Sequence, residues 1–510
     1  MTGGLSRALT PLVAVVALLT SACSQTEAAL PSEPVSEQDF RLIDRLTWGA
    51  NASEVTRFQK LGRQAWIDAQ FAPSRPIALP APVQAVLDAM PIAQASMGEL
   101  ATKVEADRVT AFAVKDPQQR RALLVPTQLA NREFIYQSDE RSLLRDVYSP
   151  DQLREQMTWF WFNHFNVRIA NPPLPTMVRD YEELTIRPRA LGRFCDLVDA
   201  TLRHPAMLFY LGNQANTADK INENYARELM ELHTMGVGSG YSQKDVQELA
   251  RILTGARADL SGWPPAPAPA GGFRDGLFVF DPALHDTGRK TLLGAPIKSQ
   301  GYAEISEATV RLCRHPATAQ RISLKIARYM VADVPPPALV DRMAGTFQAT
   351  DGDISAVLRT MIASPEFTAS LGTLYKDPQH YVLSALRLGF DGRIIAKPRI
   401  AAQMLAMLGQ ARFTRVTPDG FSLDAAEWNS SGQLATRFNI ATMIGGGGRR
   451  LFTAPDGSMP PAEAPPIKAT LAATGIHAKL APDTLTALSA ARRDSEWNSL
   501  FLSSPEFMRR

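Results

Sequence analysis

The chain has 510 residues, of which 45% are hydrophobic and 21% charged, and its formal net charge is +3 at pH 7. This length is enough to bury a large core. Because 54 dispersed Lys and Arg residues are balanced by 51 Asp and Glu residues, nothing in the charge distribution favours nucleic-acid binding, and we expect no nucleic-acid partner.

The amino-terminal residues 1–22 are predicted to be an export signal. Arg7 precedes an apolar run that is too short to span a bilayer, and small residues come directly before Cys23. This arrangement is typical of a bacterial lipoprotein acylated at Cys23, although Thr20 stands where the usual motif has leucine. The alternative is ordinary signal cleavage without a lipid.

The residues after the cysteine predict a tether and a location. Residues 23–35 are small, polar and proline-containing, as expected for a linker. Ser24 follows the cysteine, which resembles the outer-membrane sorting pattern. We expect an exported protein that is lipid-anchored in the cell envelope, on the periplasmic side of the outer membrane, or periplasmic if no lipid is attached.

The remainder of the chain, residues 36–510, is predicted to be one all-α, multi-helix globular unit, because apolar residues recur with a period of 3.6. The expected helices lie at 36–46, 53–71, 81–115, 118–146, 151–165, 177–190 and 192–204, with two more inside 222–255. After the insertion described next, helices are expected at 302–314, 316–331, 336–349, 353–363, 378–391, 396–408, 431–443, 465–474, 481–492 and 494–502.

A small irregular insertion is expected at about 256–300. Its first part contains WPPAPAPAGG, which cannot form regular helix or sheet. Its second part offers two strand candidates, Leu277–Phe280 and Thr291–Leu293, which would form a short hairpin.

The helix at 222–234 carries the densest polar pattern of the chain. Glu223, Arg227 and Glu231 follow one another at i, i+4 spacing and share one stripe. One interpretation is a charged face on which each pair contributes about 0.2–0.5 kcal/mol. The other is a buried cluster that lines a pocket, with the carboxylates acting as metal ligands or in acid–base catalysis. Both interpretations stay open.

Three histidine positions are candidate ligands or bases. His164 lies among five aromatic residues of TWFWFNHF, where desolvation would lower its pKa and favour a neutral ligand or base. His233 falls near the apolar side of the polar helix, where a satisfied core histidine is the more common outcome. The adjacent pair His285 and Asp286 lies in the insertion, and loops often carry functional residues. For each position a purely structural hydrogen bond is the alternative.

Two cysteines, Cys195 and Cys313, remain after the signal. An exported protein would be able to join them in a disulfide. Both lie in apolar helical patterns, however, so two buried free thiols are the alternative.

Several segments together resemble the bacterial domain of unknown function 1800 family. They include FWFNHFNV, NENYARELMELHTMGV, YSQKDVQELARILTG and HDTGRKTLLG, in the family's order. The resemblance implies one mostly helical, often exported unit without an assigned reaction. It also implies a partner, because such proteins are often encoded beside the exported, sulfatase-like domain of unknown function 1501 family.

Two function hypotheses follow. We favour a non-catalytic helical lipoprotein that acts as a scaffold or as a partner of an exported enzyme, because each candidate group has an adequate structural explanation. The alternative is a hydrolase-like enzyme that acts on an envelope or extracellular polymer with a divalent metal as cofactor. It requires the candidate groups to converge on one site: His164, Glu223, Arg227, Glu231, His285 and Asp286.

Overall fold

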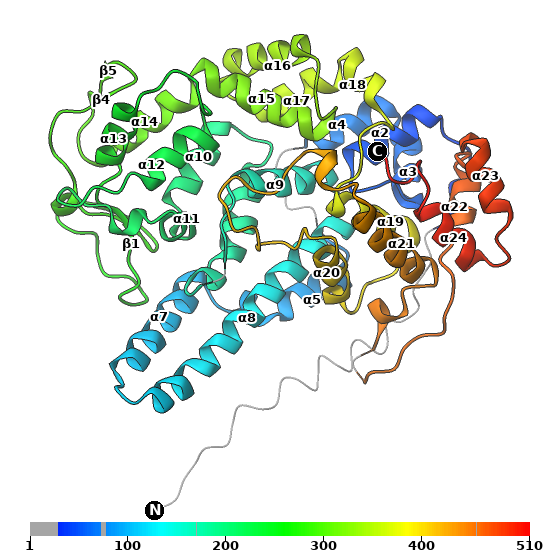
Figure 1. The fold of residues 1–510 in the computed structure, drawn as a ribbon, viewed down its shortest axis with the longest axis horizontal. Helices are drawn as coiled ribbons and strands as arrows, with labels where there is room; N and C mark the ends of the chain where they lie inside the picture. Colours follow the sequence, from blue (N-terminus) through cyan, green and yellow to red (C-terminus); the bar gives the residue numbers. More distant parts are fainter. Residues whose placement is uncertain (1–28, 73–77, 170, 455) are drawn as a thin grey trace, which may run out of the picture.

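The computed structural model of the protein describes residues 29–72, 78–169, 171–454 and 456–510 (Figure 1). The predicted signal, Cys23 and the first part of the predicted tether lie outside these residues. None of the helices in the described ranges combines the length and the apolar character that crossing a bilayer requires.

The described chain is mostly helical, which confirms the predicted all-α class. The α-helices before the insertion are α2 (Glu37–Leu46), α3 (Ala52–Leu61), α4 (Arg63–Gln70), α5 (Ala81–Ala89), α6 (Pro91–Gln94), α7 (Met97–Ala113), α8 (Pro117–Tyr148), α9 (Gln152–His164), α10 (Phe194–Arg203), α11 (Pro205–Tyr210), α12 (Asn224–Glu228) and α13 (Gln243–Ile252). Those after it are α14 (Tyr302–Cys313), α15 (Pro316–Met330), α16 (Pro337–Ala349), α17 (Ile354–Ile362), α18 (Pro365–Ser370), α19 (Pro378–Gly389), α20 (Pro398–Met407), α21 (Ser431–Gly445), α22 (Ile467–Ala473), α23 (Pro482–Ser489) and α24 (Asp494–Leu502).

Short helices of other types connect these elements. Two are π-helices, η2 (Asp180–Ile186) and η5 (Leu229–His233). The others are single 3₁₀ turns: η1 (Leu174–Thr176), η3 (Arg187–Arg189), η4 (Asn213–Ala215), η6 (Pro282–Leu284), η7 (Ala425–Glu427), η8 (Arg449–Phe452) and η9 (His477–Lys479).

Four predicted helices differ from what the structure contains. The expected helix at 222–234 is the short α12 followed by the π-helix η5. The expected helix at 53–71 breaks into α3 and α4 at Gly62, whose φ of 78° ends the first helix. The expected helix at 81–115 is α5, α6 and α7, because Ser96 forms a capping box with Glu99 and starts a new helix there. The expected helix at 177–190 is instead the π-helix η2 followed by the 3₁₀ turn η3.

The insertion holds two small sheets instead of the expected hairpin. Its strands are β1 (Ala256–Ala258), β2 (Phe273–Asp275), β3 (Phe278–Phe280), β4 (Thr291–Leu292) and β5 (Ala295–Pro296). The two predicted strands exist as β3 and β4 but do not pair: β3 lies between β1 and β2, and β4 pairs with β5. Each has a nearer partner across a two-residue connection, and Leu293 and Gly294 both take the positive φ that the β4–β5 turn requires.

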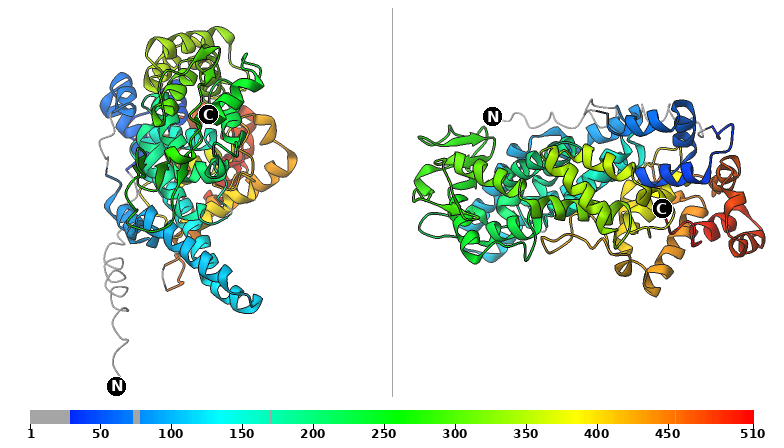
Figure 2. Two further views of the ribbon diagram at one scale, coloured as in Figure 1. Left: turned by 90° about the vertical axis from the view of Figure 1, so that its left-hand side faces the viewer. Right: turned by 90° about the horizontal axis from the view of Figure 1, so that it is seen from above.

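The centre of the molecule is occupied by α9 and α19, in each of which every residue is buried (Figure 1). The main cluster of buried apolar residues extends from Phe40 to Met508, and a smaller one packs α5 and α6 against α8. By contrast, α7 and the first half of α8 leave the body as a two-helix arm (Figure 2).

Candidate functional site

Two of the sequence segments that carry the family resemblance meet at a pair of histidines. His164 is the last residue of α9 and His233 the last residue of η5, and their ring centroids are 6.0 Å apart. The rings of Trp161 and Phe165 pack edge-on against His164, which is 2% exposed. Thus the aromatic cluster forms a wall around His164, as the sequence suggested, and it brings His233 into the same group.

The turn after η5 depends on Gly236. Its amide donates to the carbonyl of Met230, and its φ is 92°, a conformation that favours glycine. A Cβ at this position would lie 3.0 Å from the Arg321 side chain. The close approach places α15, which carries Arg321, directly beside the histidine pair.

The third member of the cluster is Lys325 of α15. Its ammonium nitrogen lies 2.8 Å from His164 Nδ1, and His164 Nε2 lies 3.0 Å from the carbonyl oxygen of His233. A carbonyl only accepts, so Nε2 carries the proton and Nδ1 accepts from Lys325. The two contacts therefore fix the tautomer of His164.

Burial shifts the pKa of all three groups downward. Desolvation, followed by the charge of Arg321, lowers the pKa of Lys325 to about 7. Desolvation and then Lys325 hold the pKa of His164 well below its usual value, and the pKa of His233 falls to about 3. The two histidines are therefore neutral bases at neutral pH, and Lys325 is close to its own titration there. Solvent reaches the cluster at Lys325, whose side chain is only partly buried.

We predict that Lys325 makes stability depend on pH. The folded state favours the neutral amine, with a pKa of about 7 against 10.5 for an unperturbed lysine. The unfolded chain therefore binds more protons between these values, and this contribution to stability rises with pH there, by up to about 1.4 kcal/mol per pH unit. Urea unfolding of wild type and Lys325→Met between pH 7.5 and 9.5 should show this slope only in wild type. The matched control is Lys103→Met on the exposed side of α7; equal slopes in wild type and Lys325→Met would contradict the assignment.

The polar stripe of α12 and η5 forms a ladder of ion pairs. Arg227 lies 3.0 Å from Glu223 and 3.7 Å from Glu231, and all three side chains are about one-third exposed. Gln243 of α13 donates to Glu223 and accepts from Arg227. The geometry matches the charged-face interpretation, with the ladder connecting α12 to α13.

One end of the ladder approaches the histidine cluster. Tyr241 interacts with Glu231, and desolvation together with this carboxylate raises the pKa of Tyr241 to about 12. Arg321 acts on both Tyr241 and Lys325. The ladder and the histidine cluster are thus neighbours. In the described chain, no hydrogen bond or ion pair joins Glu231 to either histidine.

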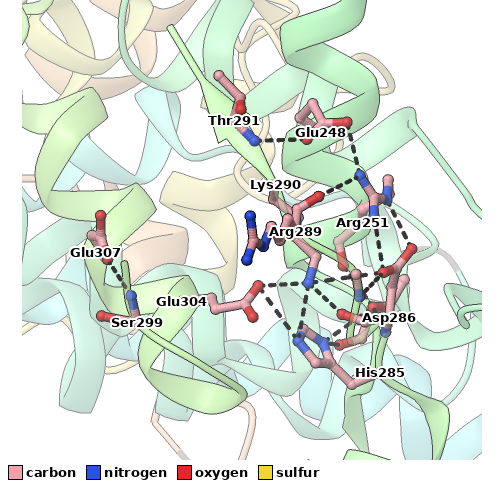
Figure 3. A network of polar contacts seen from close by, with 12 residues as sticks. Glu248, Arg251, His285, Asp286, Arg289, Lys290, Thr291, Ser299, Glu304 and Glu307 are labelled. Carbon is pink, nitrogen blue, oxygen red and sulfur yellow. Dashed lines mark hydrogen bonds and ion pairs between the residues drawn. The ribbon is translucent and has the colours of Figure 1, made fainter. Parts of the chain in front are cut away.

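His285 and Asp286 belong to a different network, at the start of the β4–β5 region (Figure 3). Gly255 allows the chain to turn here with a φ of 78°. A Cβ at this position would lie 2.6 Å from the Asp281 carbonyl oxygen and 3.3 Å from His285 Cβ, so a larger residue would clash. His285 Nδ1 then donates to the Thr254 carbonyl at 2.8 Å.

The positive charge at the centre of this network is the ammonium group of Lys290. The Lys290 ammonium lies 2.7 Å from Glu304 and 3.5 Å from His285 Nε2, and it donates to the backbone carbonyl of Asp286. The Asp286 carboxylate binds the guanidinium of Arg251 at 2.8 and 3.0 Å (Figure 3). Lys290 and Glu304 are almost completely buried, so each supplies the charge that the other requires.

The candidate residues therefore fall into three groups: the histidine cluster, the ladder, and the network of His285 and Asp286. Within the described ranges, no hydrogen bond or ion pair joins a member of one group to a member of another. The same residues contain no group of three or more His, Cys, Asp or Glu side chains arranged to hold a metal ion.

We predict that breaking the Lys290–Glu304 ion pair by replacing Lys290 alone strongly destabilises the fold. Replacing both partners together should restore most of the lost stability. Lys290→Met leaves Glu304 buried without a counter-charge, which should cost about 3–5 kcal/mol of unfolding free energy. The double variant Lys290→Met/Glu304→Leu should recover most of that loss, because two apolar side chains of similar volume replace the pair. Urea denaturation measures both; a double variant as unstable as the single one would show that the charges are not coupled.

A fourth network was not predicted from the sequence. Arg412, which is buried, forms ion pairs with Asp146 of α8 and with Glu182 of η2, and it lies 3.9 Å from Asp139. Desolvation outweighs the attraction of Arg412 and raises the pKa of Asp146 to about 8, of Glu182 to about 7 and of Asp139 to about 6. At pH 7, Asp146 therefore keeps its proton for most of the time and Glu182 for about half of it, whereas Asp139 is mostly ionised.

A weak signal for this network was present in the sequence. Asp139 and Asp146 are seven residues apart and therefore share one face of the helix predicted at 118–146. Leu143 and Val147 lie in the same stretch and are buried, so a buried acidic stripe was inferable. Arg412 follows α20, far along the chain, and no local pattern connects it to α8.

Comparison with known proteins gives one match. A family model described as "Protein of unknown function (DUF1800)" covers residues 41–509. No curated protein and no solved structure matches the chain.

Proposed function

The chain belongs to the DUF1800 family, and from its surface and its amino-terminal sequence we propose that it is an exported lipoprotein that functions by binding. In this proposal Cys23 carries the lipid, the lipid holds the protein in the cell envelope, and the helical body acts as a scaffold or as a partner of an exported enzyme.

The observation that carries the proposal is the arm formed by α7 and the first half of α8 (Figure 2). Five large apolar side chains of this arm are exposed by 40–57%: Val109, Phe112, Leu123, Val125 and Leu129. Such side chains are ordinary when scattered singly, but several on one projecting element mark an interaction surface.

A groove between α7 of the arm and the body lies beside this surface. It has a volume of about 700 Å³ and is lined by Arg108 and Val109 of the arm and by Phe209, Arg257 and Leu260 of the body. Its lining mixes apolar side chains with arginines and with the acids Glu105 and Asp259, and Arg108 pairs with Glu105, so it suits a protein segment of mixed polarity. This supports a protein partner.

The polar helix supports binding over catalysis as well. Its charges pair with one another and with Gln243, so the ladder has a structural role that explains Glu223, Arg227 and Glu231. The partner we propose is an exported sulfatase-like protein of the domain of unknown function 1501 family, because its genes often accompany those of this family.

A second candidate function is supported by the Lys325–His164 contact. A lysine with a pKa of about 7 next to a neutral histidine is a suitable acid–base pair near neutral pH. The alternative is therefore a hydrolase-like enzyme acting on an envelope or extracellular polymer through this pair. The divalent metal first expected for it finds no cluster of three or more ligands among the described residues, since the candidate groups do not converge.

Binding is tested with the purified mature chain and the sulfatase-like protein encoded beside it, by isothermal titration calorimetry. We expect a complex that Phe112→Glu and Leu129→Glu weaken at least about tenfold, because each places a charge among the exposed apolar side chains of the arm. Val334→Glu is the matched control, since Val334 is 88% exposed and lies outside the arm. Equal weakening of the complex by all three variants would contradict the proposal that the arm is the binding surface. Turnover of a polymer substrate that is lost in Lys325→Met and kept in Phe112→Glu would favour the enzyme.

Lipidation makes a separate prediction. The full-length chain expressed in a bacterial host should partition into the membrane fraction and gain the mass of a diacylglyceryl modification on Cys23. Cys23→Ser should abolish the mass increase and release the protein into the soluble periplasmic fraction, since nothing else in the described chain crosses a bilayer. Wild-type protein that is cleaved but carries no lipid would support a periplasmic location without an anchor.

A further inference from the structure

Cys195 and Cys313 come together although they lie on opposite sides of the insertion in the sequence. Cys195 is in the first turn of α10 and Cys313 is the last residue of α14, and these two helices pack against each other. Both thiols are free, their side chains interact, and both line one cavity of about 200 Å³. Cys313 is fully buried, whereas Cys195 is partly exposed.

We propose that Cys195 and Cys313 form a reversible dithiol–disulfide pair, which is oxidised by thiol–disulfide exchange through the cavity that they share. Neither a metal nor another cofactor takes part. The oxidant is a disulfide, either a small molecule such as oxidised glutathione or the disulfide of an oxidoreductase. Its occurrence in the cell depends on the export proposed above, whereas the chemistry of the pair does not.

The rim of the cavity is arranged to admit such an oxidant. Arg314 follows Cys313 and lines the cavity, and it binds Asp351 at 2.6 and 3.0 Å. Arg193 binds the same carboxylate at 3.2 Å. Two guanidinium groups against one carboxylate leave a positive rim, which attracts an anionic disulfide.

The difference in burial sets the order of the two steps. Burial raises the pKa of the Cys313 thiol well above its usual value, so the exposed Cys195 reacts first. The Cys195 thiolate attacks the disulfide R–S–S–R′, whose S–S bond breaks and releases R′S⁻. Cys313 then loses its proton and attacks the Cys195 sulfur, which expels RS⁻. The protein loses two electrons and two protons, and the oxidant becomes two thiols.

The bridge would connect to the histidine cluster. Phe194 precedes Cys195, and its ring contacts both His164 and Phe347. A disulfide between α10 and α14 would close a loop that contains η5 and the whole insertion, so it would restrict the chain on which His233 lies.

The test uses the mature chain with Cys23→Ser, which leaves these two cysteines as its only thiols. The reduced, folded protein is incubated with oxidised glutathione, quenched with N-ethylmaleimide and analysed by intact-mass spectrometry. We expect both thiols to be lost without retained glutathione, a cross-linked peptide that contains Cys195 and Cys313, and a melting temperature several degrees above that of the reduced protein.

Single variants check the order of the steps. Cys313→Ser should stop at the mixed disulfide and retain one glutathione on Cys195, while Cys195→Ser should retain none. Circular dichroism verifies that both variants are folded. The proposal would be overturned by any of three results with the parent protein after oxidation: two thiols that still react with maleimide, a stable mixed disulfide, or disulfide-linked dimers.

A further pair of variants tests the positive rim. Arg314→Gln should slow the oxidation several-fold. Arg342→Gln, which removes an exposed arginine away from the cavity, should leave the oxidation rate unchanged.

Discussion

The packing of this molecule depends on buried guanidinium groups that bind backbone carbonyls at the ends of distant segments. Arg45 is fully buried and donates to the carbonyls of Met330, Ser370 and Arg510, which lie in three different parts of the chain. Arg387 donates in the same way to Gly49 and Val147. Free carbonyls at helix ends cannot be satisfied within a helix, and leaving one buried and unpaired costs about 1–3 kcal/mol. Each buried arginine therefore satisfies carbonyls of separate segments, including the ends of α15 and α18 for Arg45 and of α8 for Arg387, and fixes their relative positions.

The same requirement explains the charged clusters in the interior. Arg412 lies against Asp146 and Glu182, and Lys290 lies against Glu304, so in each case a buried cation faces at least one carboxylate. Around Arg412, desolvation outweighs the attraction of the cation and raises the pKa of Asp146 to about 8 and of Glu182 to about 7, so protons balance part of the buried negative charge. Perturbed pKa values in this protein are in large part a consequence of structural charge burial, and they do not identify a catalytic site by themselves.

Local features of the fold were predictable because their causes are local. Ser242 and Asp245 form the capping box that their spacing predicts, and the helices expected after 300 begin and end within a few residues of those observed. The pairing of β3 and β4 was predicted wrongly, since alternation identifies a strand but not its partner. For the candidate site, the sequence identified His164 and His233 but not Lys325, whose place on the helix at 316–331 gives no sign of the histidine that it contacts.

The contact between Lys325 and His164 is unlike the other buried charges, because it joins two bases. Lys325 forms no ion pair with a carboxylate of the described chain, and Asp419 acts on it only from a distance. Other interior cations without a carboxylate partner, such as Arg45 and Arg387, donate to several backbone carbonyls, whereas the partner of the Lys325 ammonium is a histidine nitrogen. Sequences agree with their folds at most positions, and a position that gives up stability without a structural return is where function is expected. Lys325, which is partly exposed beside two histidines whose pKa values are lowered, is the interior cation on which the second candidate function proposed above rests.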